Sequence, residues 1–378
     1  MSAAEALFDL PAAETDERLG KHRRLIVRQE SPFNGGPPPD LLTQTALTPN
    51  DLFFVRNHGE IPEIDPAAWR LSVGGLVRRP LSLTLEEIRH LPKVTLTATL
   101  QCAGIRRQEL ATVEPIPHEL PWGPEAVSTA EWSGACLSDL LAAAEARRRA
   151  RHVAFVGRDE TERHGERFCF GGSIPLAKAW GQEVLLAYEM NGEPLPPVHG
   201  APLRVVVPGY IGARSVKWLT RIAVQEAPSD NYFQAKAYRM FPASMRPETV
   251  DYAAGFMLGE LPVNSVICSP GEGESLPAGR VRIAGWAMAG GGRRVERVEV
   301  SADGGRSWTV AGVDDERGDW AWRLWNAELD LSAGSHEVVC RAWDSAAQTQ
   351  PEHPAQVWNF KGYANNAWHR VRITCRPQ

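Results

Sequence analysis

Hydrophobic and polar residues alternate along several short stretches in the first 240 residues. Residues 94–101 read Val-Thr-Leu-Thr-Ala-Thr-Leu-Gln, a period of two that is typical of a strand with one buried face. The run 84–88, Thr-Leu-Glu-Glu-Ile, is expected to start a capped helix. Further strands are predicted at 71–76, 152–157 and 203–207. Helices are predicted at 137–149, where Leu137, Leu140, Leu141 and Ala144 share one face, and at 174–180.

After about residue 240 the pattern changes to short alternating strands. Eight of the 13 tryptophans lie in this part, and the turn Asp303-Gly304-Gly305 is typical of a tight hairpin. Short strands with turn signals and buried aromatic residues indicate a β-sandwich. The strands are predicted at 281–287, 295–301, 320–324 and 336–343.

A chain of 378 residues is too long for one ordinary core, so two domains are expected. The polar first forty residues end in Gly-Gly-Pro-Pro-Pro and predict an extended arm at 1–40. The first domain is then expected at 41–237 and the second at 238–378.

Charge and cysteine usage exclude several classes of protein. The net charge of −5 argues against a nucleic-acid partner, and no stretch is long enough to suggest a membrane. The basic run 147–151 is expected to be a solvated helix end. No secretory or twin-arginine signal follows Met1, so a cytoplasmic location is expected if Met1 is the natural start.

The six cysteines are scattered singly, and the histidines form no metal-binding pair. We therefore expect no iron–sulfur cluster, zinc finger or c-type haem. Any metal would be held by few protein ligands or brought by an organic cofactor.

Cys102 stands at the end of the strand predicted at 94–101 and is followed closely by Arg106 and Arg107. Positive charge beside a thiol favours the thiolate, which is a soft metal ligand or a nucleophile. The two arginines would also attract an anion, so this segment offers a ligand and an oxyanion receptor together. The alternative is a small buried hydrophobic residue, as most isolated cysteines are.

Two more segments combine cations with other polar groups. In the first, the glycine-bearing turn 208–213 lies between His199 and Arg204 on one side and Arg214, Ser215 and Lys217 on the other, a set that suits a phosphate. In the second, residues 53–59 read Phe-Phe-Val-Arg-Asn-His-Gly. Each has a structural alternative: an ordinary glycine turn for the first, and an edge strand with a polar end for the second.

These segments together resemble the sulfite oxidase family. The run 100–107 is similar to the family's cysteine motif, except that Ile105 stands where the family normally has Asn. Arg56-Asn57-His58 resembles its pterin-contacting segment, 185–219 its cofactor-binding core, and 365–371 its closing signature. The resemblance extends from about residue 45 to the C-terminus in the family's order.

The resemblance implies an α+β fold: a mixed α/β molybdopterin-binding catalytic domain (41–237), followed by an immunoglobulin-like β-sandwich dimerisation domain (238–378). It also implies a molybdenum atom bound by a pterin dithiolene, with Cys102 as the only protein ligand. The residues implied to hold the cofactor are Phe54, Arg56, Asn57, His58, Cys102, His199, Arg204, Ser215, Val216 and Lys217.

The substrate pocket implied by the resemblance contains Arg56, Arg107, Trp122, Tyr238 and Lys361. Trp122 matches only if one residue is inserted after Cys102. Lys361 stands where the family has arginine; lysine keeps the charge but loses the bidentate fork.

The implied activity is oxidation of sulfite, or a related small oxyanion, to sulfate by two-electron oxygen-atom transfer. Electrons would pass to an external acceptor, either a cytochrome, another protein or oxygen. No haem, flavin or iron–sulfur cluster is expected, and a homodimer is expected.

Two alternatives stay open. The first is a molybdenum-dependent reductase of nitrate or a sulfoxide, although related nitrate reductases usually have an apolar residue at the position of Lys361 and the sulfoxide reductases lack the sandwich. The second is a catalytically idle cofactor-binding or structural dimer, which would not need Tyr238 beside Arg56 and Arg107.

Overall fold

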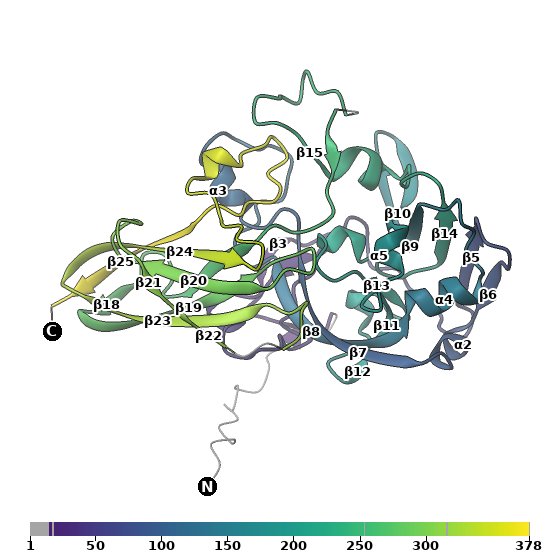
Figure 1. Cartoon of the computed structure of the whole chain (residues 1–378), viewed down its shortest axis with the longest axis horizontal. Helices are drawn as coiled ribbons and strands as arrows, with labels where there is room; N and C mark the ends of the chain where they lie inside the picture. The colour runs from purple at the N-terminus through teal and green to yellow at the C-terminus, as the bar shows by residue number, and fades with distance from the viewer. Residues whose placement is uncertain (1–14, 17–18, 253, 315–316, 378) are drawn as a thin grey trace, which may run out of the picture.

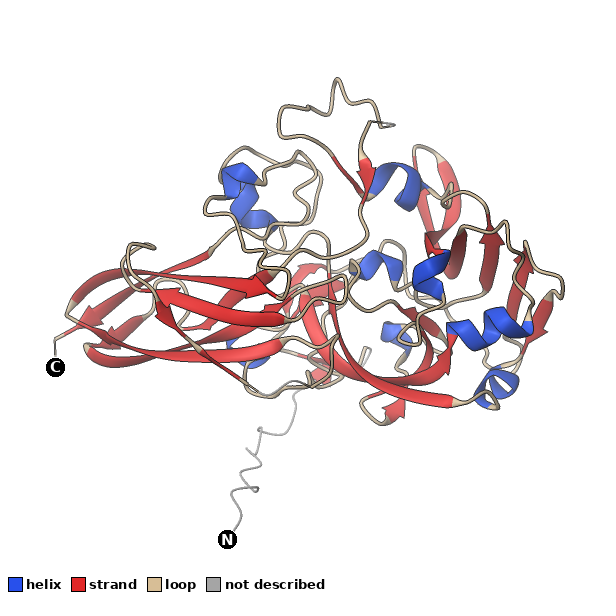
Figure 2. Ribbon diagram, viewed as in Figure 1, coloured by secondary structure: helices blue, strands red, loops and turns tan. Residues whose placement is uncertain are grey.

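The computed structural model describes residues 15–16, 19–252, 254–314 and 317–377. Two parts lie next to each other along the long axis of the molecule, and the C-terminus lies at the far end of the second (Figure 1). Strands dominate both parts, and the helices are short and gather in the first (Figure 2). We call the first part the mixed domain and the second, from β17 to β25, the sandwich domain. The predicted α+β class is confirmed, and the boundaries at 40 and 237 stay predictions.

One sheet of the mixed domain has five strands in the order β10-β9-β14-β5-β6. It confirms the strands predicted at 71–76 and 152–157. The second of these is longer than predicted because alternate residues of its polar half, Asp159 and Thr161, are also buried. The strands are β5 (Leu71–Gly75), β6 (Leu81–Leu83), β9 (His152–Arg163), β10 (Glu166–Pro175) and β14 (Arg221–Gln225).

The second sheet has the order β12-β11-β8-β7, and β13 pairs with β11. It confirms the strands predicted at 94–101 and 203–207. The end of β7 is buried on both faces because the sandwich domain covers it: Thr99 N–H donates to the Trp320 carbonyl. The strands are β7 (Lys93–Gln101), β8 (Val127–Cys136), β11 (Leu185–Met190), β12 (Glu193–Pro194) and β13 (Arg204–Val206).

The capped helix is confirmed, since the Thr84 hydroxyl and the Glu87 carboxylate form a capping box at the start of α2. The other two helix predictions are too long. The helices are α1 (Pro39–Leu42), α2 (Leu85–Arg89), α3 (Arg107–Ala111), α4 (Leu137–Ala143) and α5 (Leu176–Ala179), with single turns η1 (Pro197–His199), η2 (Gly212–Arg214), η3 (Phe233–Ala237) and η4 (Pro354–Gln356).

The helix predicted at 137–149 ends early because Glu145 adopts a left-handed conformation (φ 54°). The basic run 147–151 is therefore not a helix end, and that prediction is wrong. Arg147 instead donates its backbone N–H to the Leu76 carbonyl and its Nε to the Val77 carbonyl. The helix predicted at 174–180 is confirmed only for 176–179, because its first two residues complete β10.

The sandwich domain consists of two packed sheets, β17-β19-β23-β22 and β18-β25-β24-β20-β21. The strand predicted at 320–324 begins only at Arg323, because Trp320 and Trp322 bond back to Thr99 of β7. The strands are β17 (Asn264–Ser269), β18 (Ser275–Pro277), β19 (Gly279–Met288), β20 (Val295–Ser301), β21 (Thr309–Val310), β22 (Gly312–Val313), β23 (Arg323–Leu331), β24 (Gly334–Asp344) and β25 (His369–Arg376); β15 (Arg239–Met240) and β16 (Phe256–Met257) pair between the domains.

The described part of the N-terminal arm lies against the mixed domain. Gly35 forms a bridge with Val55, and the side chain of Lys21 is inserted among buried residues. The arm contains β1 (Thr15–Asp16), β2 (Lys21–His22), β3 (Ile26–Gln29) and β4 (Asn34–Gly36).

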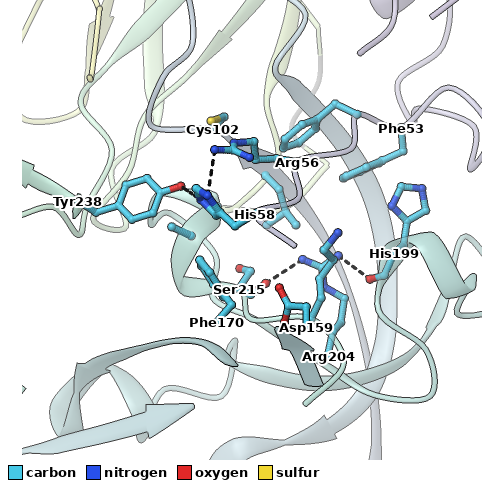
Figure 3. Close-up of a pocket in the computed structure, with 15 residues that line it drawn as sticks. Phe53, Arg56, His58, Cys102, Asp159, Phe170, His199, Arg204, Ser215 and Tyr238 are labelled. Carbon is cyan, nitrogen blue, oxygen red and sulfur yellow. Dashed lines mark hydrogen bonds between the residues drawn. The ribbon is translucent and has the colours of Figure 1, made fainter. Parts of the chain in front are cut away.

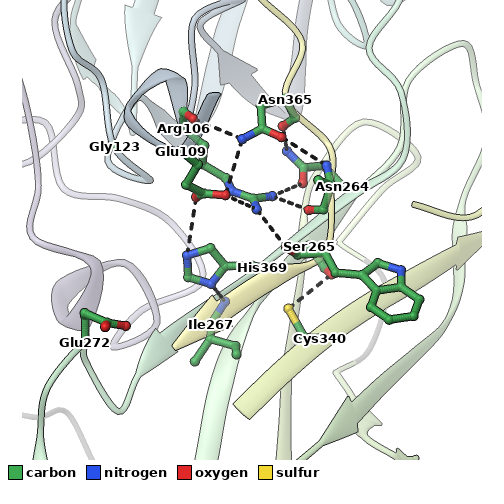
Figure 4. A network of polar contacts seen from close by, with 12 residues as sticks. Arg106, Glu109, Gly123, Asn264, Ser265, Ile267, Glu272, Cys340, Asn365 and His369 are labelled. Atoms are coloured by element: carbon green, nitrogen blue, oxygen red, sulfur yellow. Dashed lines mark hydrogen bonds and ion pairs between the residues drawn. The ribbon is translucent and has the colours of Figure 1, made fainter. Parts of the chain in front are cut away.

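A buried polar network joins the two domains directly behind the loop that follows β7 (Figure 4). Its centre is Arg106, which is 0% exposed and pairs with Glu109 at 2.6 Å. The same guanidinium donates to the carbonyls of Ala367 and Trp368 and to Asn264 Oδ1. A buried charge is stable only when its hydrogen bonds are satisfied, so this network fixes the domains relative to each other.

His369 belongs to this network and generates a testable pH dependence. Its Nδ1 accepts from Ile267 N–H, and burial, followed by the Arg106 charge, lowers its pKa to about 4. Between about pH 6.5 and pH 4, the unfolded chain therefore binds a proton at His369 and the folded chain does not. The free energy of unfolding falls as the pH falls through that range.

We expect His369→Gln to remove about 3 kcal/mol of this loss, measured as the difference in unfolding free energy in urea between pH 7 and pH 4. The exposed His90→Gln provides the matched control. Equal losses in wild type and His369→Gln would show that His369 is protonated in the folded chain.

Candidate active site

A cavity of about 640 Å³, counted with its mouth, opens in the mixed domain between the two sheets (Figure 3). Segments far apart in the sequence converge on it, including the 53–58 segment, the end of β7, η1 and the 212–217 turn. Its lining residues are Phe53, Phe54, Arg56, His58, Leu100, Cys102, Asp159, Phe170, His199, Arg204, Gly212, Ala213, Ser215, Lys217 and Tyr238.

Cys102 is placed by the end of β7, and its N–H donates to the Ala126 carbonyl. Its sulfur accepts from Gly104 N–H at 3.4 Å, and the residue is 6% exposed at the cavity wall. Buried thiols elsewhere fit the alternative of small hydrophobic residues; burial raises the pKa of Cys340 to about 12, for example. Among the described residues that line the cavity, Cys102 is the one thiol.

Arg56, His58 and Tyr238 form a hydrogen-bonded chain along one wall (Figure 3). Arg56 Nη2 lies 3.1 Å from His58 Nδ1, and His58 Nε2 lies 2.7 Å from the Tyr238 hydroxyl. Burial lowers the pKa of His58, and the Arg56 charge lowers it further, so the imidazole is neutral. Because arginine can only donate, Nδ1 accepts and Nε2–H donates to the tyrosine oxygen.

This polarity leaves the hydroxyl hydrogen of Tyr238 free to point into the cavity. Burial raises the pKa of Tyr238 to about 12, so the hydroxyl keeps its proton at neutral pH. The wall therefore presents a hydrogen-bond donor to the cavity that Cys102 also lines.

The opposite end of the cavity is cationic. Arg204 is 4% exposed and donates to the carbonyls of His199 and Ser215, and Lys217 Nζ donates to Asn57 Oδ1 and the Val198 carbonyl. Burial lowers the pKa of Arg204 to about 9 and also lowers that of Lys217. These groups are therefore desolvated without a matching number of anions.

Asp159 is the one carboxylate among the described residues that line the cavity, and its Oδ1 has no hydrogen-bond partner there. Burial raises its pKa to about 7, so it offsets the cations only in part. The sequence reasoning missed Asp159, because β9 was expected to end at 157; the only signal was the continued alternation of the strand.

Lys21 is a second residue that the sequence reasoning missed. Its Nζ donates to the carbonyls of Asn50 and Phe53 at 2.6 and 2.7 Å and lies 3.2 Å from His199 Nε2. Burial lowers the pKa of Lys21 to about 7. The N-terminal arm thus contacts His199 through Lys21, and no local pattern in the sequence predicts this contact.

This donor set fits the molybdenum cofactor that the resemblance implies. One thiol lies at one end, and buried cations with a serine hydroxyl lie at the other, which suits a soft metal and a phosphate. No cluster of three or more His, Cys, Asp or Glu side chains that could hold a metal occurs in the described ranges.

The remaining predicted cofactor residues lie just outside the lining. Asn57 is buried and holds Lys217, and Val216 is buried in the core behind the turn. Ile105, where the family has Asn, is also fully buried.

The predicted oxyanion receptor needs correction. Arg106 points away from the cavity into the interdomain network, so the prediction that it attracts an anion beside Cys102 is wrong. Its neighbour Arg107 begins α3 and donates to the carbonyls of Leu120 and Lys361. The two side chains diverge because Arg106 has a left-handed backbone (φ 56°).

Trp122 and Lys361 also lie outside the cavity lining. Trp122 is 0% exposed, and its indole N–H has no partner among the residues that the structure describes. Lys361 Nζ pairs with Glu119 at 2.9 Å.

Two family models match this chain. Residues 58–233 match the family model of the oxidoreductase molybdopterin binding domain, and residues 256–376 match the Mo-co oxidoreductase dimerisation domain. None of the helices in the described ranges has the length and apolar character to cross a membrane.

Mitochondrial sulfite oxidase of Homo sapiens is 45% identical over 97% of this chain and 69% of its own length. Sulfite oxidase of Arabidopsis thaliana is 42% identical over 96% of both chains. The solved sulfane dehydrogenase SoxCD from Paracoccus pantotrophus is 26% identical with a TM-score of 0.78, covering 98% of this chain and 92% of that chain. With both family domains matched and identities above 40% over nearly the whole chain, the chain belongs to the sulfite oxidase family of molybdopterin-binding oxidoreductases.

Proposed function

We propose that this chain oxidises sulfite to sulfate at a molybdenum cofactor bound in the cavity. The observation that carries the proposal is one cavity lined by a single thiol, Cys102, by the proton-bearing Tyr238, and by the buried cations Arg204 and Lys217. The high identity to the sulfite oxidases of Homo sapiens and Arabidopsis thaliana supports sulfite as the substrate.

The reaction adds one oxygen atom from water to the sulfur of sulfite and releases two electrons and two protons. The bound molybdenum cofactor would supply the two-electron oxygen-atom transfer. Cys102 would ligate the metal, and Arg204, Ser215 and Lys217 would hold the phosphate end of the pterin. His199, whose Nε2 lies 3.2 Å from Lys21 Nζ, would contact the pterin between Cys102 and the phosphate end.

The substrate side would use positive charge and one donor. The charges of Arg56 and Arg107 would attract the oxyanion, since the neighbouring His58 is neutral and does not offset or add to them. Tyr238 would donate its hydroxyl hydrogen to an oxygen near the metal. Lys361 would add a further cation at the outer side, and buried Trp122 would pack the wall behind them.

Lys361 favours sulfite over the alternative of nitrate reduction. It is a cation with a side chain 19% exposed, where nitrate reductases of the family usually have an apolar residue. The sandwich domain, with its match to the Mo-co dimerisation domain, argues against the related sulfoxide reductases.

The match to a dimerisation domain supports a homodimer as the working assembly. An external electron acceptor, whether a cytochrome, another protein or oxygen, and a cytoplasmic location stay predictions.

Cys102→Ser tests the metal ligand. Because a hydroxyl is a poor ligand for a soft metal, we expect sulfite-dependent reduction of ferricyanide to fall by about a hundredfold or more. Cys169→Ser, at a half-buried thiol outside the cavity, is the matched control. Near-normal turnover by Cys102→Ser would rule out the ligand assignment, and metal-replete wild-type protein inactive with sulfite would rule out the proposed reaction.

Arg204→Met tests the phosphate end. Loss of a buried cation that contacts an anion is expected to lower cofactor retention by about tenfold or more. The measurement is molybdenum and pterin content per folded protein after gel filtration. Because Arg204 also donates to two carbonyls, Lys217→Met is measured beside it, and the exposed Arg221→Met is the control. Full cofactor content in both cavity variants would contradict the assignment.

A further inference from the structure

One carboxylate, Glu119, lies between Arg107 and Lys361, two cations of the proposed substrate site that lie outside the cavity lining. Its Oε1 pairs with Lys361 Nζ at 2.9 Å, and its Oε2 lies 3.6 Å from Arg107 Nη2. The Lys361 carbonyl also accepts from Arg107 Nε at 3.1 Å. The three residues thus form a closed ring of charges, in which one internal anion, Glu119, occupies an anion receptor made of two cations.

This ring is next to the cavity. Arg107 covers Gly104, two residues from Cys102, so closely that a Cβ at Gly104 would meet Arg107 Nη2 at 2.5 Å. The guanidinium carbon lies 5.2 Å from the centre of the Tyr363 ring, which in turn stacks on Tyr238 at 5.4 Å. An anion held by Arg107 would therefore lie one ring away from the cavity wall.

Solvent anions can reach the ring. The side chains of Glu119 and Lys361 are 20% and 19% exposed, whereas that of Arg107 is 5% exposed. Glu119 lies on the segment between α3 and β8, directly after His118, which adopts a left-handed conformation (φ 64°). This is the segment in which the resemblance needs one inserted residue before Trp122.

The charge of Glu119 affects the pKa of two tyrosines near the cavity. Burial raises the pKa of Tyr363, and Glu119 is the next cause that raises it; it also adds to the raised pKa of Tyr238. An ionised carboxylate at this distance weakens the positive potential that an incoming oxyanion would meet.

We propose that Glu119 sets the affinity of the substrate site for anions: it is an internal counter-anion that the oxyanion must displace from Arg107 and Lys361. The inference rests on the proposed function for its substrate class, a small oxyanion such as sulfite or sulfate. Glu119 lowers the affinity for both substrate and product, and its return to the receptor favours release of sulfate.

The competing interpretation is that Glu119 only anchors Lys361. The two ideas differ in Glu119→Gln, which keeps a hydrogen-bond acceptor for Lys361 Nζ but removes the charge. Glu119→Ala removes both. Glu114→Gln is the matched control, because Glu114 lies on the same segment and pairs with Arg246 at 3.1 Å on the surface.

The experiment is isothermal titration of sulfate into the oxidised holoenzyme, which does not depend on turnover. We expect Glu119→Gln and Glu119→Ala to bind sulfate about fivefold more tightly than wild type at low salt, with Glu114→Gln unchanged. The gain should shrink as ionic strength rises. In steady-state assays the KM for sulfite should fall by a similar factor without a rise in kcat.

Sulfate affinity unchanged in Glu119→Gln, or altered only in Glu119→Ala, would overturn the proposal in favour of an anchor. Equal gains in Glu114→Gln would reduce it to a general effect of net charge and would also overturn it. Tighter sulfate binding by Glu119→Gln in a protein that does not oxidise sulfite would support the counter-anion and contradict only the proposed reaction.

Discussion

The position of Cys102 depends on how the buried guanidinium of Arg106 is held. Leaving such a charge unpaired inside a protein costs about 3–5 kcal/mol. Arg106 avoids that cost through Glu109 and through two carbonyls from the strand entry at 367–368. Because its own backbone belongs to the loop after β7, the sandwich domain holds the cysteine loop in place. The domain without cavity residues is therefore part of the active-site scaffold.

The cationic end of the cavity has the opposite character. Arg204, Lys217 and Lys21 are desolvated, and their pKa values are lowered, with Asp159 as a single, partly protonated counter-charge. Backbone carbonyls hold the cations in place but cannot neutralise them. Burying an excess of positive charge costs free energy when no anion is bound, and a bound phosphate offsets that cost. Cofactor binding is therefore expected to increase the free energy of unfolding.

The sequence predicts features that are local and misses those that depend on distant contacts. The alternation at 94–101 predicts β7, and Thr84 with Glu87 predicts the start of α2, because each signal lies within a few residues. The motif residues of the cavity likewise lie in short runs, and nine of them line it. Their roles in binding stay predictions.

The misses have physical causes. Arg106 and Arg107 look equivalent in the sequence, yet with a left-handed backbone at Arg106 the Arg106 side chain enters the interdomain network and the Arg107 side chain lies over the Tyr363 ring. Lys21 reaches His199 across 178 positions, and Glu119 reaches Lys361 across 242, so neither pairing leaves a periodic or spaced pattern. The predicted helix 137–149 is too long because residues 145–149, Glu-Ala-Arg-Arg-Arg, contain neither glycine nor proline, so the sequence gives no sign of the left-handed turn at Glu145 (φ 54°).

The site contains two kinds of positive charge, and the difference follows from burial. Arg204 is nearly inaccessible and bonded to carbonyls, so an anion bound there has no internal competitor among its hydrogen-bond partners and would stay. Arg107 and Lys361 are balanced by Glu119, a carboxylate that reaches solvent and can exchange with another anion. A cofactor must remain through many turnovers, whereas a substrate and its product must come and go. Buried cations whose only nearby carboxylate in the cavity lining is the partly protonated Asp159 suit the first need, and cations with a replaceable counter-ion suit the second.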